Sequence, residues 1–107
     1  KMHAIVEDVV EASHNGIISW EIKSNVQPIL LQGKDDYEKT KERWIIFEEY
    51  FNENSIKFKK ITSIEGDIIS KLVNLIYILD YASIYLAVIN KIDPTPVYSI
   101  DYIKKRL

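Results

Sequence analysis

The sequence contains no cysteine, only three glycines and three prolines, and almost no excess of charge of one sign. The absence of cysteine excludes disulfides, thiolate metal sites and cysteine nucleophiles. None of the glycines, at positions 16, 33 and 66, lies in a glycine-rich loop that binds phosphate. The formal net charge is −2, from 14 basic and 16 acidic residues, and no basic stripe is present. We therefore expect no nucleic-acid partner.

What is present is the composition of one ordinary globular domain. The chain has 107 residues, of which 47% are hydrophobic and 28% are charged. Lys1 is followed by Met2 and no signal peptide is visible, so we expect the chain to be part of a longer protein. The pair Asp35 and Asp36 lacks a third ligand at a suitable spacing, and we expect neither a metal site nor a cofactor.

The apolar pattern of the first sixty residues predicts alternating strands and helices. We expect an extended piece at 4–6 and a short helix over 8–20 that bends near Gly16. A buried strand at 27–31 precedes an amphipathic helix that begins at Asp35 or Asp36 and ends near Asn52. A second strand over 56–61 carries lysines on one face, which indicates an edge strand.

The remaining residues predict a long helix over 65–90 and a short final helix through Arg106. The spacing of Thr62 and Glu65 is that of a capping box, and Ser99 is a suitable N-cap for the final helix. The long helix is apolar nearly all round, which favours burial or association. A membrane span is the rival interpretation, but Asp80 and other polar residues weigh against it, and we expect no membrane partner.

This order of elements predicts an α/β fold with a parallel sheet and right-handed crossovers. Only two or three strands are visible, whereas sheets usually have more. We therefore expect an incomplete α/β unit that depends on further chain or on a partner.

The residues alone leave the chemistry open between a small binding module and part of an enzyme. His14 lies in a polar stretch, where it can exchange protons near neutral pH, but a surface histidine without a role fits equally. The other histidine, His3, has no polar cluster around it. Lys104 can contact an anionic substrate or complement the end of a helix dipole.

Three stretches together resemble the bifunctional phosphoglucose/phosphomannose isomerases. Residues 13–21, SHNGIISWE, are similar to the family's HNE-I-x-x-WE segment, although Gly16 stands where the family usually has glutamate. Residues 93–97, DPTPV, followed by 100–107, are similar to its terminal DPTPV and ID-x-LK-x-x-L segments. Residues 35–37 and 41–43 resemble the family's helix after its next strand. The resemblance covers nearly the whole chain in order.

The resemblance implies that residues 1–107 are the C-terminal part of a second sugar isomerase (SIS) domain, a flavodoxin-like α/β sandwich that is incomplete here. It implies interconversion of glucose 6-phosphate or mannose 6-phosphate with fructose 6-phosphate through a cis-enediol, in a cytoplasmic homodimer. By the same resemblance, His14 matches the ring-opening acid, Lys104 a catalytic lysine at the substrate, and Thr95 a position at the sugar end of the pocket.

The resemblance also implies what the chain lacks. The family's phosphate loops belong to the first domain, and its catalytic glutamate lies in an NEN-like motif upstream of Lys1. The run Asn52, Glu53, Asn54 has these letters, but it stands at the wrong place in the order and is interpreted as a coincidence. We therefore expect the chain to be inactive alone. The alternatives are a non-catalytic sugar-phosphate-binding or dimerisation module and a stand-alone flavodoxin-like domain.

Overall fold

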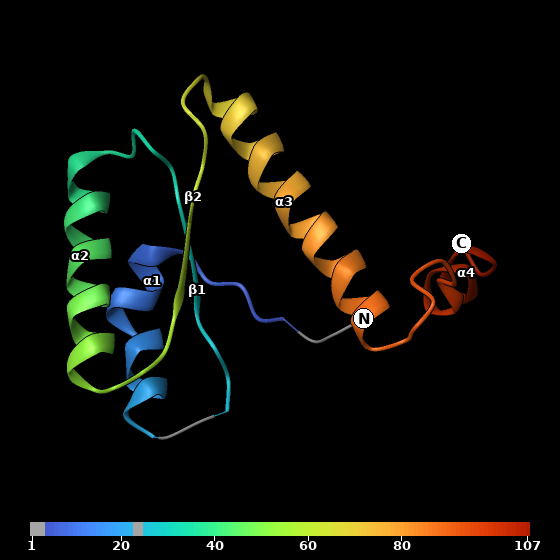
Figure 1. Ribbon diagram of the computed structural model, residues 1–107, viewed down its shortest axis with the longest axis horizontal. Helices are drawn as coiled ribbons and strands as arrows, with labels where there is room; N and C mark the ends of the chain where they lie inside the picture. The colour runs from blue at the N-terminus through green and yellow to red at the C-terminus, as the bar shows by residue number, and fades with distance from the viewer. Residues whose placement is uncertain (1–3, 23–24) are drawn as a thin grey trace. The chain divides into compact units, whose positions relative to one another are not determined.

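A computed structural model describes residues 4–22 and 25–107 of the chain. The order of elements is α1 (Val9–His14), the 3₁₀ helix η1 (Gly16–Glu21), β1 (Ile29–Gln32), α2 (Glu38–Glu53), β2 (Lys59–Thr62), α3 (Ile68–Ile89) and α4 (Tyr98–Lys104). The chain divides into two compact units, Ala4–Leu75 and Ile76–Leu107, which are described separately below (Figure 1).

The first unit is built around a parallel two-stranded sheet, as the sequence predicted. Ile29 pairs with Lys59 and Gln32 pairs with Thr62. Helices α1 and α2 lie on the same face of the sheet (Figure 1). The mixed helix and strand composition agrees with part of an SIS domain.

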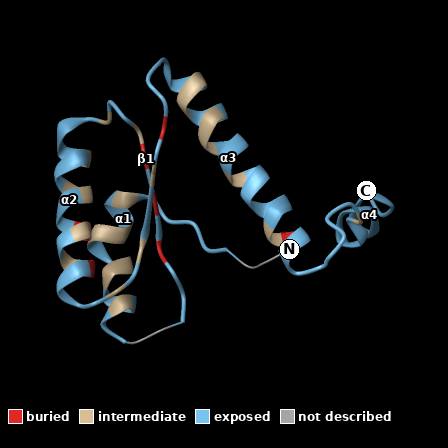
Figure 2. Ribbon diagram, viewed as in Figure 1, coloured by how far each residue is buried: buried red, intermediate tan, exposed pale blue. Residues whose placement is uncertain are grey.

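The core of this unit lies between the sheet and its helices. Leu30, Phe47 and Phe51 are buried, and Phe51 is only 1% exposed. Trp20 packs its ring edge-on against Phe51, with the ring centroids 5.5 Å apart. Figure 2 shows the buried residues of this unit on the strands and on the side of α2 that faces them. Aromatic packing therefore supplies most of this small core.

The strands differ from the prediction in burial and bounds. Only Leu30 and Gln32 of β1 are buried, whereas Ile29 and Leu31 on the other face are exposed. The sequence predicted a buried strand over 27–31, and this was wrong for the side chains of Ile29 and Leu31, because α1 and α2 cover the other face of the sheet. β2 starts at Lys59, three residues after the predicted start, and its lysines are exposed as expected of an edge strand.

The N-terminal region contains the predicted bend, and the predicted extended piece at 4–6 is not a strand of the sheet. Residues 4–8 form neither helix nor strand. α1 ends at His14 and η1 begins at Gly16, so the helix breaks where the glycine predicted it. The Asp8 carboxylate accepts the backbone N–H groups of Val10 and Glu11, which fixes the start of α1.

The helix starts predicted for α2, α3 and α4 were wrong by two to three residues. α2 begins at Glu38, because the Asp36 carboxylate accepts the Gly33 N–H at 2.9 Å and holds a turn before the helix. α3 begins at Ile68, because the Asp67 carboxylate accepts the N–H group three residues on, whereas the predicted cap, Thr62, is the last residue of β2. In α4, Val97 occupies the N-cap and Ser99 lies inside the helix.

The second unit consists of the greater part of α3, a proline-containing connector and α4. Ala87 is its one buried hydrophobic side chain among the residues described. The connector turns at Asp93, whose carboxylate accepts the Thr95 N–H at 2.9 Å. α3 has 22 residues and a mean hydropathy of 1.9 in its most apolar window, so by length and composition alone it can cross a membrane.

Candidate functional site

His14 is placed by the last turn of α1. Its Nδ1 atom lies 3.2 Å from the carbonyl oxygen of Val10, so a proton on Nδ1 is donated to that oxygen. This contact leaves Nε2 at the exposed end of the helix. An imidazole held by one nitrogen and open at the other is suited to exchange a proton with a ligand.

The residues after His14 are held by the preceding turn of the helix. The Asn15 side chain donates to the Glu11 carboxylate at 2.6 Å, and the Asn15 N–H donates to the Glu11 carbonyl at 2.9 Å. Ser13 donates its hydroxyl to the same Val10 oxygen that His14 contacts. The polar stretch that the sequence singled out is therefore an ordered helix end.

The space beside the Cα atom of Gly16 is filled by the carboxylate of another residue. The Glu7 carboxylate lies where a Cβ atom on residue 16 would stand. Gly16 does not have a left-handed backbone, so its backbone conformation does not require glycine. A larger residue at this position requires the exposed Glu7 side chain to move away.

A groove of about 430 Å³ lies between α1 with η1 on one side and α2 on the other, and His14 is not among the residues that line it. Ile17, Ile46 and Tyr50 contribute apolar surface, and Ser13 lies on its wall. At one end Lys39 pairs with Glu42 at 2.9 Å, and Arg43 donates to the Lys39 carbonyl. The cations of the groove are thus partly engaged within α2.

Thr95 and Lys104 belong to the second compact unit, whereas His14 belongs to the first. Thr95 is exposed in the turn that Asp93 fixes. Lys104 is exposed in the last turn of α4, and its ammonium group has no partner among the described residues. Its position also suits the negative end of the helix dipole. The local geometry leaves each side chain accessible to a ligand.

Ion pairs at the carboxyl ends of the strands were missed by the sequence reasoning. Lys34 pairs with Glu65, and Lys71 lies 3.0 Å from the Asp35 carboxylate. The hydrogen bond and the charge of Lys71 hold the pKa of Asp35 below its usual value. Parallel α/β sheets bind ligands at the carboxyl ends of their strands. The charged residues that follow each predicted strand could therefore have been singled out from the sequence. Within each pair the two charges neutralise each other, and the pairs link the loop after β1 to residues that follow β2.

Glu48 connects α2 to the sheet. It accepts the Gln32 side-chain amide at 2.9 Å and the Lys60 ammonium at 2.7 Å. Burial raises the pKa of Glu48, but the hydrogen bonds from Lys60 and Gln32 together outweigh burial and leave the pKa lowered. Glu48 therefore stays ionised at neutral pH and acts as a structural group.

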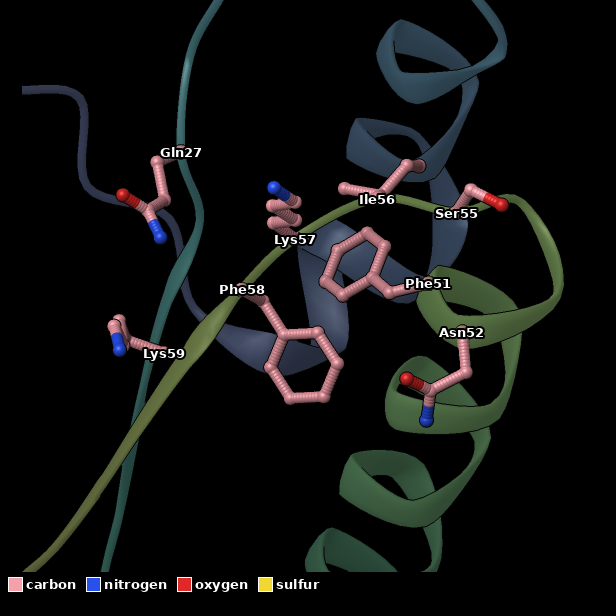
Figure 3. Close-up of a pocket in the computed structure, with 8 residues that line it drawn as sticks. All are labelled: Gln27, Phe51, Asn52, Ser55, Ile56, Lys57, Phe58 and Lys59. Carbon is pink, nitrogen blue, oxygen red and sulfur yellow. The ribbon is translucent and has the colours of Figure 1, made fainter.

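The larger hollow of the first unit, about 620 Å³, lies at the opposite edge of the sheet (Figure 3). Phe51 and Phe58 form its apolar wall, and Lys57 and Lys59 line it near the start of β2. Asn52, from the run that resembles the NEN motif, lines the same hollow. None of the predicted site residues lines it, and it lies at the amino ends of the strands, away from the usual ligand edge.

No group of three metal-ligating side chains occurs in residues 4–22 and 25–107. Of the candidate residues, the pair Asp35 and Asp36 is engaged otherwise, with Lys71 and with the Gly33 and Trp44 N–H groups respectively. His3 lies outside the described residues.

Comparison with known proteins identifies the family. The family described as the bacterial phospho-glucose isomerase C-terminal SIS domain matches residues 1–107. A curated bifunctional phosphoglucose/phosphomannose isomerase from Caldicellulosiruptor bescii is 30% identical over 101 residues, which cover 91% of this chain. The chain spans 30% of the length of that relative. No solved structure matches significantly. The chain therefore belongs to the bacterial phospho-glucose isomerase C-terminal SIS domain family.

Proposed function

We propose that the chain contributes one part of the active site of an isomerase that interconverts glucose 6-phosphate or mannose 6-phosphate with fructose 6-phosphate. The observation that carries this proposal is the family match over the whole chain, which includes the SHNG segment. The curated relative is a bifunctional phosphoglucose/phosphomannose isomerase, and both activities in its name are sugar-phosphate isomerisations of this class. The complete flavodoxin-like sandwich, a position as the C-terminal part of a second SIS domain and a cytoplasmic location belong to the same proposal.

In this proposal His14 opens the sugar ring. Its Nε2–H donates a proton to the ring oxygen, and the hydrogen bond from Nδ1 to the Val10 carbonyl orients the imidazole. Lys104 supplies a positive charge and hydrogen bonds to sugar oxygens, and Thr95 borders the sugar end of the pocket. The base that moves the proton between C1 and C2 and the groups that bind phosphate come from outside residues 1–107.

The proposed enzyme is a homodimer in which His14 serves the active site of the neighbouring subunit. The exposed position of His14 at the end of α1 supports this role, because it leaves Nε2 accessible from outside its own unit. We expect the 107-residue chain by itself to be inactive. Sedimentation of the active protein measures its oligomeric state.

The role of His14 is tested in an active protein that contains this chain. His14→Ala is expected to lower kcat on ring-closed glucose 6-phosphate by about 10²–10⁴-fold. An aldose phosphate too short to close a ring needs no ring opening, and its isomerisation should stay near the unsubstituted rate. An unchanged kcat on glucose 6-phosphate would remove His14 from the mechanism, and an equal loss on both substrates would make it structural.

The second candidate is a module that binds sugar phosphate without turnover. The departure at Gly16, where the Glu7 carboxylate fills the space, favours it. Calorimetric titration of the active-length protein with fructose 6-phosphate, followed by an isomerase assay, separates the two candidates. Binding without turnover supports the module.

A further inference from the structure

The joint between α1 and η1 carries an asparagine followed by a glycine. Asn15 is exposed at the C-cap of α1, where its backbone, with φ −120° and ψ −43°, departs from the helix. The helical hydrogen bonds of α1 end with the Asn15 N–H, which donates to the Glu11 carbonyl at 2.9 Å. The next N–H group, that of Gly16, has no acceptor among the described residues. An unengaged amide nitrogen therefore follows an exposed asparagine side chain.

This arrangement permits a reaction between the two neighbouring residues. The Gly16 nitrogen attacks the side-chain carbonyl carbon of Asn15, a C–N bond forms, and the bond to the side-chain nitrogen breaks as ammonia leaves. Water then opens the resulting succinimide ring at either carbonyl, and the product is aspartate or isoaspartate. One water is consumed for each ammonia released, so no other reactant is needed. Glycine has no Cβ atom that would obstruct closure of the ring.

Two carboxylates flank the reacting atoms and act in opposite directions. The Glu7 carboxylate lies beside the Cα atom of Gly16, which is the atom bonded to the attacking nitrogen. A carboxylate at this place can accept the proton that the nitrogen loses as it attacks. The Glu11 carboxylate accepts the Asn15 side-chain N–H at 2.6 Å and so directs the amide back along α1. Glu7 therefore favours ring closure, and Glu11 restrains it.

A second asparagine at a helix end provides a contrast within the same chain. Asn54 is the C-cap of α2, and its side chain also bonds to the preceding turn, by donating to the Tyr50 carbonyl at 2.8 Å. The N–H group that follows it, that of Ser55, donates to the Asn52 carbonyl at 3.1 Å. Ser55 also carries a Cβ atom, which glycine lacks. The attacking nitrogen is thus engaged and shielded at Asn54, whereas it is neither at Asn15.

We propose that Asn15 is a site of spontaneous deamidation, which Glu11 restrains and which loosens the end of α1 as the protein ages. The new carboxylate repels the Glu11 carboxylate instead of donating to it. Isoaspartate also adds a methylene group to the main chain directly after His14. Both changes weaken the turn in which Nδ1 of His14 contacts the Val10 carbonyl. Loss of isomerase activity on ageing rests on the proposed role of His14, whereas the deamidation itself does not.

The reaction is followed in an active protein that contains this chain, kept at mildly alkaline pH in water labelled with heavy oxygen. Each ring that opens takes one labelled oxygen atom, so mass spectrometry of peptic fragments measures the reaction at every asparagine. Methylation by an isoaspartyl methyltransferase identifies the isoaspartate product. We expect Asn15 to react at least about tenfold faster than Asn54, whose neighbouring N–H must first be released by local opening.

Three variants test the contributions of the neighbouring groups. Glu11→Ala frees the Asn15 side chain and should accelerate its deamidation roughly threefold to tenfold, the worth of one hydrogen bond. Glu21→Ala, at an exposed glutamate in η1, is the matched control and should leave the rate unchanged. Asn15→Gln, whose ring would need six members, should take up no label at this position and should keep its initial activity during storage.

The outcomes separate this proposal from the proposed function. Label at Asn15 that does not exceed label at Asn54 overturns the deamidation site, and this comparison needs no variant. A rate that is the same with and without Glu11 overturns the restraint. Hydrogen exchange of residues 9–14 that is equal in fresh and aged protein overturns the loosening of α1. Faster exchange there with activity fully retained supports the proposal and contradicts only the role of His14 in ring opening.

Discussion

At the scale of single residues, Glu48 shows how a buried polar group is kept satisfied in a small core. Gln32 is 9% exposed, and its side-chain amide donates to Glu48. Lys60, from the neighbouring strand, donates to both carboxylate oxygens. One carboxylate therefore joins β1, β2 and α2, and the spacing of these residues in the sequence gave no indication of it.

Removal of this carboxylate should destabilise the first unit. Glu48→Ala leaves the buried Gln32 amide without its partner, which costs about 1–3 kcal/mol. Urea unfolding followed by tryptophan fluorescence measures the loss. Glu49→Ala, at the exposed neighbouring position, is the control and should change the free energy of unfolding by less than about 0.5 kcal/mol. Equal effects of the two variants would contradict the role of Glu48.

The candidate residues were predictable only through resemblance. His14 is exposed, and nothing in its periodicity separates it from an ordinary surface histidine. The hydrogen bond to Val10 follows from helix geometry four residues apart and was accessible in principle. The Glu7 carboxylate against Gly16 was not, because the path of residues 4–8 depends on tertiary packing.

At the scale of elements, α3 shows why helix starts are hard to place from sequence. Residues 62–65 and 67–70 both carry a side chain that can cap a helix. Thr62, the predicted cap, is instead the last residue of β2 and pairs with Gln32, and the next residue, Ser63, accepts the Lys34 N–H. The cap therefore falls to Asp67, because the earlier candidate belongs to the sheet.

The first turns of α3 should loosen in acid. Lys71 lowers the pKa of Asp35, and hydrogen bonds from the Ser70 N–H and hydroxyl lower the pKa of Asp67. A carboxyl whose folded pKa is lowered contributes stability above its unfolded pKa of about 3.9, and this contribution is lost as pH falls through the folded pKa. Carbon-detected NMR titration of both carboxyls between pH 6 and pH 2 should show both midpoints below the ordinary value.

Two variants separate the causes. Lys71→Met removes the ion pair and should return the pKa of Asp35 toward its ordinary value while Asp67 titrates as before. Asp67→Asn retains an oxygen that accepts the Ser70 N–H and should keep the helix start without titrating. An Asp35 midpoint that is the same with and without Lys71 would show that the ion pair is absent in solution.

At the scale of the whole molecule, the two units differ in how their apolar groups are used. The first has an aromatic core under one face of its sheet, whereas the second buries one hydrophobic side chain among the residues described. Burial of apolar surface is the main source of stability in a folded unit. The second unit therefore has little stability of its own without further chain around it.

This difference predicts an order of hydrogen exchange in the isolated chain. The amides of β1 and α2 should exchange slowest, and those of residues 76–104 should exchange faster, because few apolar contacts protect them. Exchange at pH 6 followed by mass spectrometry of peptic fragments measures both regions in one sample. Phe51→Ala should accelerate the first region only, since Phe51 belongs to its core. Slower exchange in residues 76–104 than in β1 would contradict the prediction.

The sequence by itself determined the order of helices and strands, the parallel pairing, the break at Gly16 and the family. The order of elements, the break and the family follow from periodicity, backbone preferences and ordered motifs, which act over short distances along the chain. The parallel pairing follows from the alternation of strands and helices. Tertiary structure alone decided which face of β1 is buried, where α2 and α3 begin, and how Glu48 and Lys71 are paired. The pairs of Glu48 and Lys71 join groups 12 to 36 residues apart in the chain, and these contacts exist only after the backbone has folded. The helix starts rest on caps three residues away, but which of two possible caps is used depends on how the strands and loops pack.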